Sequence, residues 1–357
     1  MTNEAIRIGL ANGNISNMKK LCNLSYKELK RYTDVPSVYK LCAISKAAGI
    51  LASRKKSIKR EYPTKDPYVK KPLLVSCYSF KIVNGKLKIP IARRKYEFIP
   101  LNNHTMKVLE DKTLKVRSFT LTETALSLCI AKEVPEIQDI AGAVGIDRNV
   151  LNLTVGNLSQ VRYYDMSRVV EIGETTKDIV RSFKRNDVRI RKQITSKYGR
   201  RKKNRTQNIL NLVSNNLVLF CLLNKLAIAF EDIKYIRSMY QKGNYQGKSY
   251  RRQMNNNWPF AEIKRQIEYK VQWLGIPVIH LTKNETRGTS KECYICGERL
   301  QRALKEDVLH KRQLWCKKCG KWFDRDTVAV MNISRKGWVR FAHSSKEGIG
   351  IESYDCT

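Results

Sequence analysis

Four cysteines toward the C-terminal end of the chain have the spacing of a metal site. They form two Cys-x-x-Cys pairs, Cys293/Cys296 and Cys316/Cys319, which are separated by 19 residues. Such a turn places two sulfurs on one side of an ion, and a separation of roughly 15–20 residues is usual for four-cysteine zinc sites. A glycine follows each pair, where this turn often needs positive φ. Because four thiolates leave no coordination position open, the pattern predicts structural Zn²⁺ and disfavours two separate redox motifs.

Three acidic residues stand where a predicted strand ends or a predicted helix begins. Asp147 ends the apolar run VGID, Glu231 ends LAIAFE, and Asp326 begins the last helix. A two-metal phosphodiester hydrolase needs several carboxylates around Mg²⁺ ions roughly 4 Å apart. Alone, a strand-end Asp is a common turn residue, and Asp324 or Asp326 could be a helix N-cap. Their joint occurrence predicts a magnesium-dependent catalytic site.

The charge of the chain indicates a polyanionic partner. The 69 Lys+Arg residues exceed the 32 Asp+Glu residues, which gives a formal net charge of +37 and favours nucleic acid. Between Arg181 and Arg205, 12 of 25 residues are Lys or Arg. The residues predicted to bind a nucleic-acid backbone are Lys184, Arg185, Arg189, Arg191, Arg200, Arg201, Lys202, Lys203 and Arg205. A membrane surface is the alternative, but no run approaches about 18 consecutive apolar residues and no signal-peptide pattern is present.

Two further regions carry positive charge. A second basic zone contains Lys55, Lys56, Lys59, Arg60, Lys70, Lys71, Arg93, Arg94 and Lys95. The polar loop at 234–257 mixes rings with cations, namely Tyr240, Tyr245 and Tyr250 with Lys242, Lys248, Arg251 and Arg252. This composition suits stacking on unpaired bases. Because the loop follows Glu231, we expect it to act as a lid over the predicted site.

The elements that must position these residues change character along the chain. Residues 1 to about 60 have the apolar spacing of helices, and Ser37 after Pro36 is placed to cap one of them. Residues 61–140 hold short β-rich runs with a hairpin signal at Asn84-Gly85, which suggests a small barrel or curled sheet. Strand-turn-strand patterns start at 141. Helices follow at about 167–198 and 204–225, then a βαβ unit at 226–282, the cysteine pairs, a helix at about 325–336, and a tail without periodicity.

Six further cysteines are scattered: Cys22, Cys42, Cys77, Cys129, Cys221 and Cys356. Most have apolar neighbours, such as LSLCIA around Cys129 and LVLFCLL around Cys221. This pattern predicts small buried hydrophobic residues in a reducing compartment and no disulfide framework.

The quoted motifs resemble the TnpB family, RNA-guided nucleases carried by insertion sequences and related to type V CRISPR effectors. The motifs are VGIDRNVLNLTV, IAFEDI, WPFAEIKRQIEYKVQWLGIPVI, TSKECYICG and CKKCG followed by DRDTVAVMNI. The resemblance implies an α/β RNase H-like (RuvC-like) nuclease domain at 141–340 with an inserted zinc ribbon at 289–323. It also implies a helical recognition lobe at 1–60, a β-barrel-like wedge domain at 61–140, and a flexible tail at 341–357.

The resemblance also implies a function. Asp147, Glu231 and Asp326 become Mg²⁺ ligands of a DNA endonuclease, and the four paired cysteines become Zn²⁺ ligands. The partners become a guide RNA and a double-stranded DNA target, which is cut beside a short flanking motif. The expected location is the prokaryotic cytoplasm, at the nucleoid. Alternatives are an RNA-guided DNA-binding regulator with weak or no cleavage, a transposase or resolvase-type nuclease without guide RNA, and an inactive truncated remnant.

The chain departs from the family pattern at three places. Val328 replaces an Asn and Val330 an Ala in the third acidic motif, which predicts the loss of a polar side chain near the site. Arg148-Asn149 replaces a common Leu-Gly, and we expect Asn149 to adopt the left-handed conformation that the turn needs. The chain begins with helix-like sequence, so we expect the wedge domain to lack its leading strand.

Overall fold

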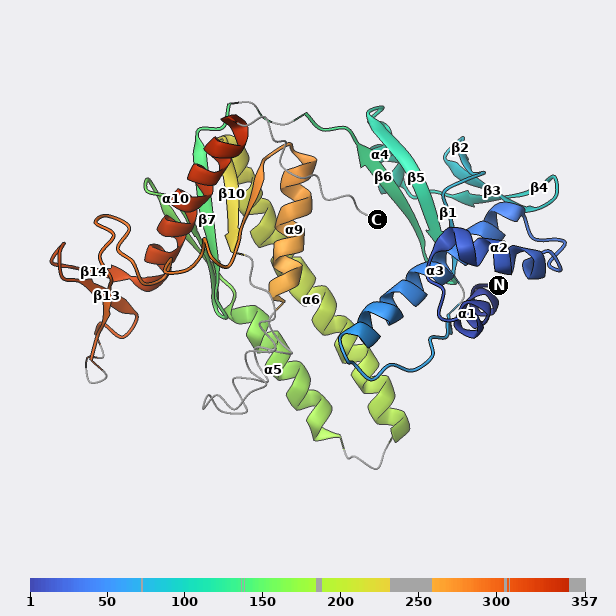
Figure 1. The fold of residues 1–357 in the computed structure, drawn as a ribbon, viewed down its shortest axis with the longest axis horizontal. Helices are drawn as coiled ribbons and strands as arrows, with labels where there is room; N and C mark the ends of the chain where they lie inside the picture. The colour runs from blue at the N-terminus through green and yellow to red at the C-terminus, as the bar shows by residue number, and fades with distance from the viewer. Residues whose placement is uncertain are drawn as a thin grey trace. The chain divides into compact units, whose positions relative to one another are not determined.

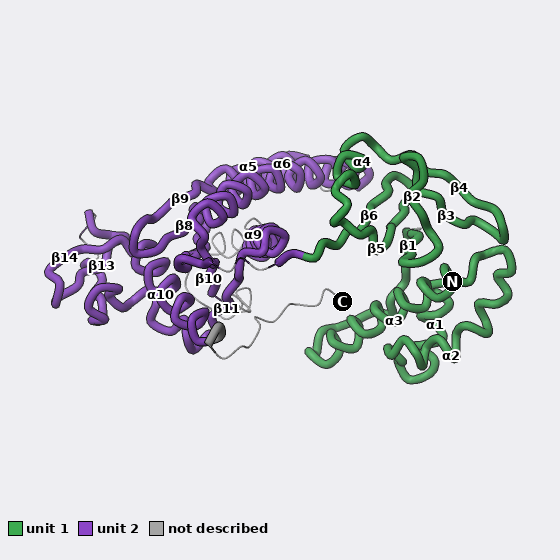
Figure 2. Tube along the Cα trace, turned by 90° about the horizontal axis from the view of Figure 1, so that it is seen from above, with its two compact units in different colours: residues 1–133 green, residues 134–357 purple. Residues whose placement is uncertain are grey.

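A computed structural model of the chain describes residues 1–71, 73–135, 137, 139–183, 188–231, 259–304, 307 and 309–346. The chain divides into two compact units, residues 1–133 and 134–357 (Figure 2). The loop at 234–257, which was predicted to be a lid, lies outside the described residues, as do Lys184, Arg185 and Cys356.

Unit 1 begins with three helices, as the apolar spacing predicts. They are α1 (Thr2–Ala11), α2 (Met18–Leu29) and α3 (Ser37–Lys59). Their apolar faces meet in one cluster that includes the fully buried Leu21, Ile44 and Leu51. The predicted cap at Ser37 is wrong: Ser37 is the first helical residue, Pro36 occupies the N-cap position, and no side chain caps α3.

Six strands and a short helix follow in unit 1. The strands are β1 (Leu74–Ser76), β2 (Lys81–Val83), β3 (Lys86–Ala92), β4 (Lys95–Pro100), β5 (Leu114–Leu121) and β6 (Leu126–Lys132), and the helix is α4 (Asn103–Leu109). The predicted hairpin between β2 and β3 is confirmed, because Asn84 and Gly85 both have positive φ. The sequence reading missed α4, whose N-cap Asn102 accepts a hydrogen bond from the Thr105 N–H.

The described strands of unit 1 pair into two antiparallel sheets, β1-β5-β6 and β2-β3-β4. Both sheets bury side chains in one cluster that includes Leu87, Phe119 and Tyr39 of α3. The helical and β-rich parts thus share a core, and the predicted barrel and its boundary at 60/61 stay predictions. Cys129 is exposed on β6, so its predicted burial is wrong: burial alternates along the strand, and Cys129 lies on the exposed face with Ser127.

Unit 2 is built on a five-stranded sheet of order β11-β10-β7-β8-β9. The strands are β7 (Gly142–Arg148), β8 (Asn152–Gly156), β9 (Val161–Asp165), β10 (Leu226–Glu231) and β11 (Val278–Leu281). β7, β8 and β9 are successive antiparallel neighbours, whereas β7, β10 and β11 run parallel. The predicted strand-turn-strand pattern and βαβ unit are therefore both present.

Helices cover both faces of this sheet (Figure 1). Large side chains such as Ile146, Ile228 and Phe230 face one side, where they pack with α5 (Ser167–Ser182), α6 (Val188–Leu223) and α9 (Phe260–Trp273). Small residues alternate with them on the other face, where α10 (Arg325–Lys346) packs. Because side chains alternate between the two faces of each strand, the bulky residues lie on one face and the small residues on the other. The face with small residues lets α10 approach the sheet closely.

The close approach of α10 depends on two glycines. A Cβ on Gly145 of β7 would meet the Val330 carbonyl oxygen, and a Cβ on Gly337 of α10 would meet the Cβ of Ala229. The prediction that the last helix ends near 336 is wrong, because it continues to Lys346. The reason is that Gly337 fits against the sheet and Trp338 and Phe341 pack beyond it.

The helix break predicted near residue 200 is also wrong. The basic run at 200–205 lies inside α6, because Arg and Lys are good helix formers and need no turn there. α6 is also long and apolar enough to cross a membrane by length and composition alone. Its buried Leu210, Leu217 and Phe220, however, belong to the core beside the sheet. Length and composition are therefore weak evidence that α6 spans a membrane.

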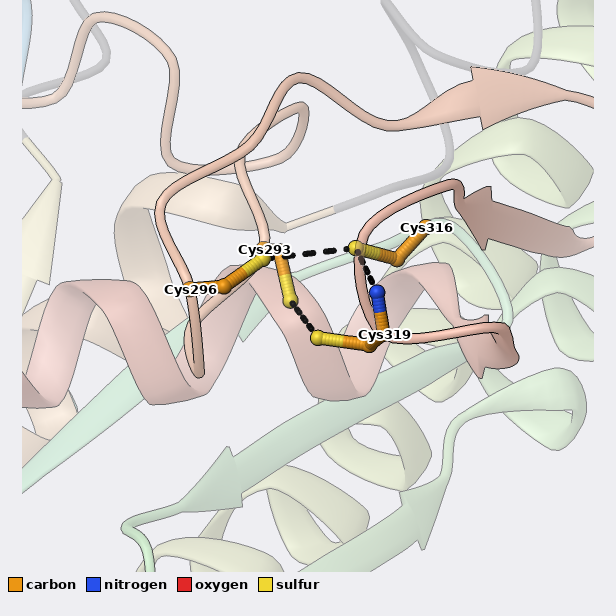
Figure 3. A group of neighbouring side chains, drawn as sticks. All are labelled: Cys293, Cys296, Cys316 and Cys319. Atoms are coloured by element: carbon orange, nitrogen blue, oxygen red, sulfur yellow. Dashed lines mark hydrogen bonds between the residues drawn. The ribbon is translucent and has the colours of Figure 1, made fainter.

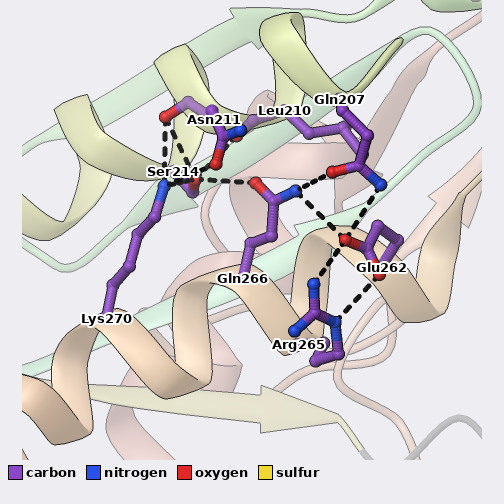
Figure 4. A network of polar contacts seen from close by, with 8 residues as sticks. All are labelled: Gln207, Leu210, Asn211, Ser214, Glu262, Arg265, Gln266 and Lys270. Carbon is purple, nitrogen blue, oxygen red and sulfur yellow. Dashed lines mark hydrogen bonds and ion pairs between the residues drawn. The ribbon is translucent and has the colours of Figure 1, made fainter. Parts of the chain in front are cut away.

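A polar network ties α6 to α9 (Figure 4). Gln266, 1% exposed, donates to Gln207 Oε1 at 2.6 Å and accepts from Ser214 Oγ at 3.2 Å. Lys270 Nζ donates to the same Ser214 oxygen at 2.6 Å. At the other end, hydrogen bonds from Arg265, then from Gln207 and Gln266, lower the pKa of Glu262 to about 2. The network fixes the register of the two helices in an otherwise apolar contact.

Candidate functional site

Two of the three predicted carboxylates lie on neighbouring parallel strands. Ile146 of β7 pairs with Phe230 of β10, so Asp147 and Glu231, one residue further on, end their strands side by side. Asp326 lies in the first turn of α10, the helix that packs on these strands. Carboxyl ends of adjacent parallel strands meet at one sheet edge, where functional groups of α/β proteins collect. The fold therefore brings together three acids that are 84 and 95 residues apart along the chain.

Asp147 has the most strongly perturbed carboxylate of the three. Burial is the main cause, followed by the negative charges of Glu231 and Asp326, and together they raise its pKa to about 6. Asn149 Nδ2 donates to Asp147 Oδ2 at 3.0 Å and opposes this shift. Clustered carboxylates that repel one another form a site prepared for a cation.

Glu231 is held from two sides. Burial raises its pKa, while a hydrogen bond from Thr289 Oγ1 to Oε1 at 2.9 Å and the charge of Arg148 oppose the rise. The buried Arg148 donates to the carbonyl oxygens of Glu231 and Phe260, at 3.1 Å each. This arginine thereby ties the end of β7 to the end of β10.

Asp326 is 4% exposed and its Oδ2 accepts two hydrogen bonds. Asn152 Nδ2 donates at 3.1 Å, and Arg312 Nη2 forms an ion pair at 2.6 Å. The alternative reading of Asp326 as a helix cap does not hold, because Asp324 Oδ1 takes that role by accepting from the Thr327 N–H at 2.9 Å. Asp324 therefore caps α10, while Asp326 binds Asn152 and Arg312 and places its negative charge beside Asp147.

Sequence reasoning missed the residues that support the acids. Asn149 and Asn152 flank the turn after β7, and their spacing from Asp147 was the available signal. Asn149 is not left-handed, so that prediction is wrong: its side chain binds Asp147 instead. Thr289 and Arg312 come from the segment between β11 and α10, and nothing local in the sequence marks them.

The four paired cysteines converge on one point (Figure 3). Their Sγ atoms all lie within 4.8 Å of one another, with Cys293–Cys319 at 3.8 Å and Cys296–Cys316 at 3.4 Å. Tetrahedral Zn–S bonds of about 2.3 Å place sulfurs about 3.8 Å apart, so the set fits zinc. Within the described part of the chain, no other group of three or more His, Cys, Asp or Glu is so close.

The turns of this ribbon are as the sequence predicts. Gly297 and Gly320 have φ of 75° and 61°, and their N–H groups donate to the Cys293 and Cys316 carbonyls at 2.9 Å. A three-stranded sheet supports them: β12 (Gln301–Arg302), β13 (Gln313–Cys316) and β14 (Lys321–Asp324). The four cysteines can therefore bind a metal such as zinc.

The ribbon and α10 share a small core. Val328, fully buried, packs with Cys293, Leu314 and Cys316. The replacement of a polar residue at 328 therefore extends the ribbon core. Asn332 on the next turn donates to the carbonyls of Thr289 and Glu292, at 2.9 and 2.8 Å, and fixes the start of the ribbon. His310, which lies between the two cysteine pairs in the sequence, stacks on Trp322 with ring centroids 4.2 Å apart and lies outside the cysteine set.

The predicted nucleic-acid-binding residues in the described chain lie on α6. Arg189, Arg200, Arg201, Lys203 and Arg205 are exposed, and Arg191 and Lys202 are half-buried. They precede the buried apolar part of the helix. The basic residues predicted from the sequence therefore form the N-terminal part of α6.

Comparisons with known proteins find similarity in sequence and in fold. A family model described as Cas12f1-like, TNB domain, matches residues 260–333. TnpB-like protein MJ0751 of Methanocaldococcus jannaschii is 29% identical over 272 residues, which cover 72% of this chain and 92% of that protein. The fold is similar to that of Cas12f1 in the cryo-EM structure of its complex with sgRNA and target DNA. The TM-score is 0.60 at 15% identity, over 93% of this chain and 79% of that chain.

Proposed function

We propose that this chain is a TnpB-family protein, from its similarity to TnpB-like protein MJ0751 and its match to the Cas12f1-like model. We further propose that it is an RNA-guided, Mg²⁺-dependent DNA endonuclease encoded by a transposable element, cleaving DNA next to a short flanking motif. The observation that carries the proposal is the convergence of Asp147, Glu231 and Asp326 on one edge of the unit 2 sheet. The five-stranded sheet, in which β8 alone runs against the other four strands, supports an RNase H-like nuclease domain with the cysteine ribbon inserted before α10.

The residues of the site divide into ligands and supports. Asp147, Glu231 and Asp326 would hold Mg²⁺, which supplies Lewis-acid polarisation of the phosphodiester and activation of water. Asn149 and Asn152 orient two of the carboxylates through the hydrogen bonds at 3.0 and 3.1 Å. Hydrogen bonds that orient a metal-binding side chain are typically worth 10- to 100-fold in metal affinity or activity.

The partners follow from charge and from the relatives. The net charge of +37 and the exposed cations of α6 suit phosphate backbones. The solved Cas12f1 structure contains sgRNA and target DNA, and we extend both partners to this chain. In such systems, base pairing with the guide reads the target sequence and the protein reads a short flanking motif. The proposed location is the prokaryotic cytoplasm, at the nucleoid.

One experiment tests the whole proposal. RNA that copurifies with the full chain is sequenced, and the protein is then programmed with that RNA against a library of flanking motifs in Mg²⁺. The expected result is cleavage of matched DNA that Asp147→Asn abolishes, while RNA binding is unchanged. Guide-dependent binding without cleavage would favour the regulator. Cleavage without bound RNA would favour the resolvase-type alternative.

A further inference from the structure

Unit 1 contains a cavity of about 800 Å³ between the start of α3 and the β2-β3-β4 sheet. One wall is the chain from Thr33 to Val38 with Lys40, and the other is formed by residues between Ser79 and Tyr96. Five cations line it, namely Lys40, Lys81, Lys88, Arg93 and Arg94, against the single carboxylate of Asp34. This size is that of a small-molecule or nucleotide site.

Lys40 is the residue that most clearly points to a ligand. It is 7% exposed, it lines the cavity, and no hydrogen bond or ion pair joins it to another described residue. Its Nζ is not among the buried side-chain atoms that lack a hydrogen-bond partner, so the stem of Lys40 is buried while its ammonium group reaches the cavity. An anion in the cavity would supply the missing partner.

The backbone beside Lys40 offers a second anion-binding feature. α3 has 23 residues, and no side chain caps its N-terminus. Its first residues, Ser37 and Val38, line the same cavity. Free N–H groups and the positive end of a helix dipole form a ready site for phosphate. Lys40 and the N-terminus of α3 therefore both line the same cavity.

The opposite wall adds an aromatic ring. Tyr96 is exposed, and Lys88 Nζ lies 4.1 Å from the centroid of its ring. Cations beside an exposed ring are typical of surfaces on which bases of single-stranded nucleic acid stack. Lys81, Arg93 and Arg94 supply further charge along this wall.

We propose that this cavity binds one unpaired nucleotide of a nucleic-acid strand, with a phosphate at Lys40 and the α3 N-terminus and the base at Tyr96. The site lies wholly within unit 1 and is separate from the carboxylate edge. It rests on the proposed binding of nucleic acid by this chain and names where one nucleotide binds, and its test does not depend on cleavage.

The test measures binding of fluorescent single-stranded RNA and single-stranded DNA to the full chain by anisotropy. Lys40→Met keeps the length and apolar stem of the side chain and removes its charge, so affinity should fall about tenfold and the salt dependence should weaken. Lys27→Met on α2 removes the same charge from an exposed position outside the cavity and should leave affinity unchanged. A loss confined to RNA or to DNA identifies the strand.

A second pair of measurements separates binding from folding. Because Lys40→Met removes no described hydrogen bond or ion pair and keeps the buried stem, the variant should melt at about the same temperature as the parent protein in the absence of nucleic acid. Tyr96→Leu, at an exposed position, should also weaken binding about tenfold through lost stacking. Unchanged affinity for both strands in Lys40→Met and Tyr96→Leu would overturn the proposal, whether or not the protein cleaves DNA.

Discussion

At Asp147, the requirements of the site oppose those of folding. Burial and two neighbouring carboxylates raise its pKa from 3.8 to about 6. Between about pH 4 and pH 6, Asp147 is therefore protonated in the folded chain and ionised in the unfolded chain. Stability from this group is therefore present at low pH and is lost as pH rises from about 4 to 6. The linked cost above pH 6 is about 3 kcal/mol, which a bound cation would relieve.

Asp147→Asn should consequently stabilise the protein in magnesium-free buffer at pH 7, by up to about 3 kcal/mol, while it removes the proposed ligand. The gain should vanish near pH 4, where the native Asp is already neutral. Thermal melts of both proteins across pH 4–8, with zinc retained, measure the difference. A variant that is equally or less stable at pH 7 would show that the three acids do not form a strained cluster.

The sequence marks Asp147 and Glu231 because each ends an apolar run, where acids are unusual, and it marks Asp326 because that residue begins the last helix. It does not mark Thr289 or Arg312, whose contacts with Glu231 and Asp326 span 58 and 14 residues. Their roles arise only when the ribbon folds against the strand ends. Long-range hydrogen bonds of this kind leave no local pattern.

At the scale of elements, the contact between α10 and the sheet depends on small residues. Gly337→Ala would usually stabilise a helix interior by up to about 1 kcal/mol. Here the new methyl group would meet the Cβ of Ala229, so we expect destabilisation of about 1–3 kcal/mol through overpacking. Chemical denaturation followed by circular dichroism gives the change in unfolding free energy.

The matched control for this prediction lies in α6. Gly199 is also inside a helix, but nothing lies within 4 Å of a Cβ there. Gly199→Ala should therefore gain the helix propensity and stabilise the chain by up to about 1 kcal/mol. Equal effects of the two substitutions would contradict the packing of α10 described above.

The elements themselves were largely predictable, and their ends were not. Alternation and apolar spacing predict β7 to β11 and the first three helices. The end of the last helix was misplaced because Gly337 usually signals a stop, whereas here it fits against Ala229. The break in α6 was misplaced because charge density was taken as a turn, although Arg and Lys favour helix.

At the scale of the molecule, the order of the motifs along the chain predicts the architecture of unit 2. The architecture of unit 1 was harder to predict from the sequence, because its strands are short and its two sheets share a core with α3. The cavity at Lys40 depends on that joint packing: neither the helical segment nor the β-rich segment contains it alone. The sequence around Lys40 does not mark this residue as part of a cavity.

Removal of the ribbon metal should disable the carboxylate site in the other part of unit 2. Thr289 and Arg312 contact Glu231 and Asp326 from the ribbon segment, and Val328 connects the cysteine core to the turn of α10 that carries Asp326. Binding of a four-thiolate metal contributes on the order of 10 kcal/mol to local folding. Chelation or Cys293→Ser should therefore unfold the ribbon, change the fluorescence of Trp315 and Trp322, and weaken Mg²⁺ binding at least tenfold.

Cys129→Ser, at an exposed position of unit 1, should retain both zinc content and Mg²⁺ affinity. A zinc-free protein with unchanged Mg²⁺ affinity, measured by calorimetry, would show that the ribbon does not support the carboxylates.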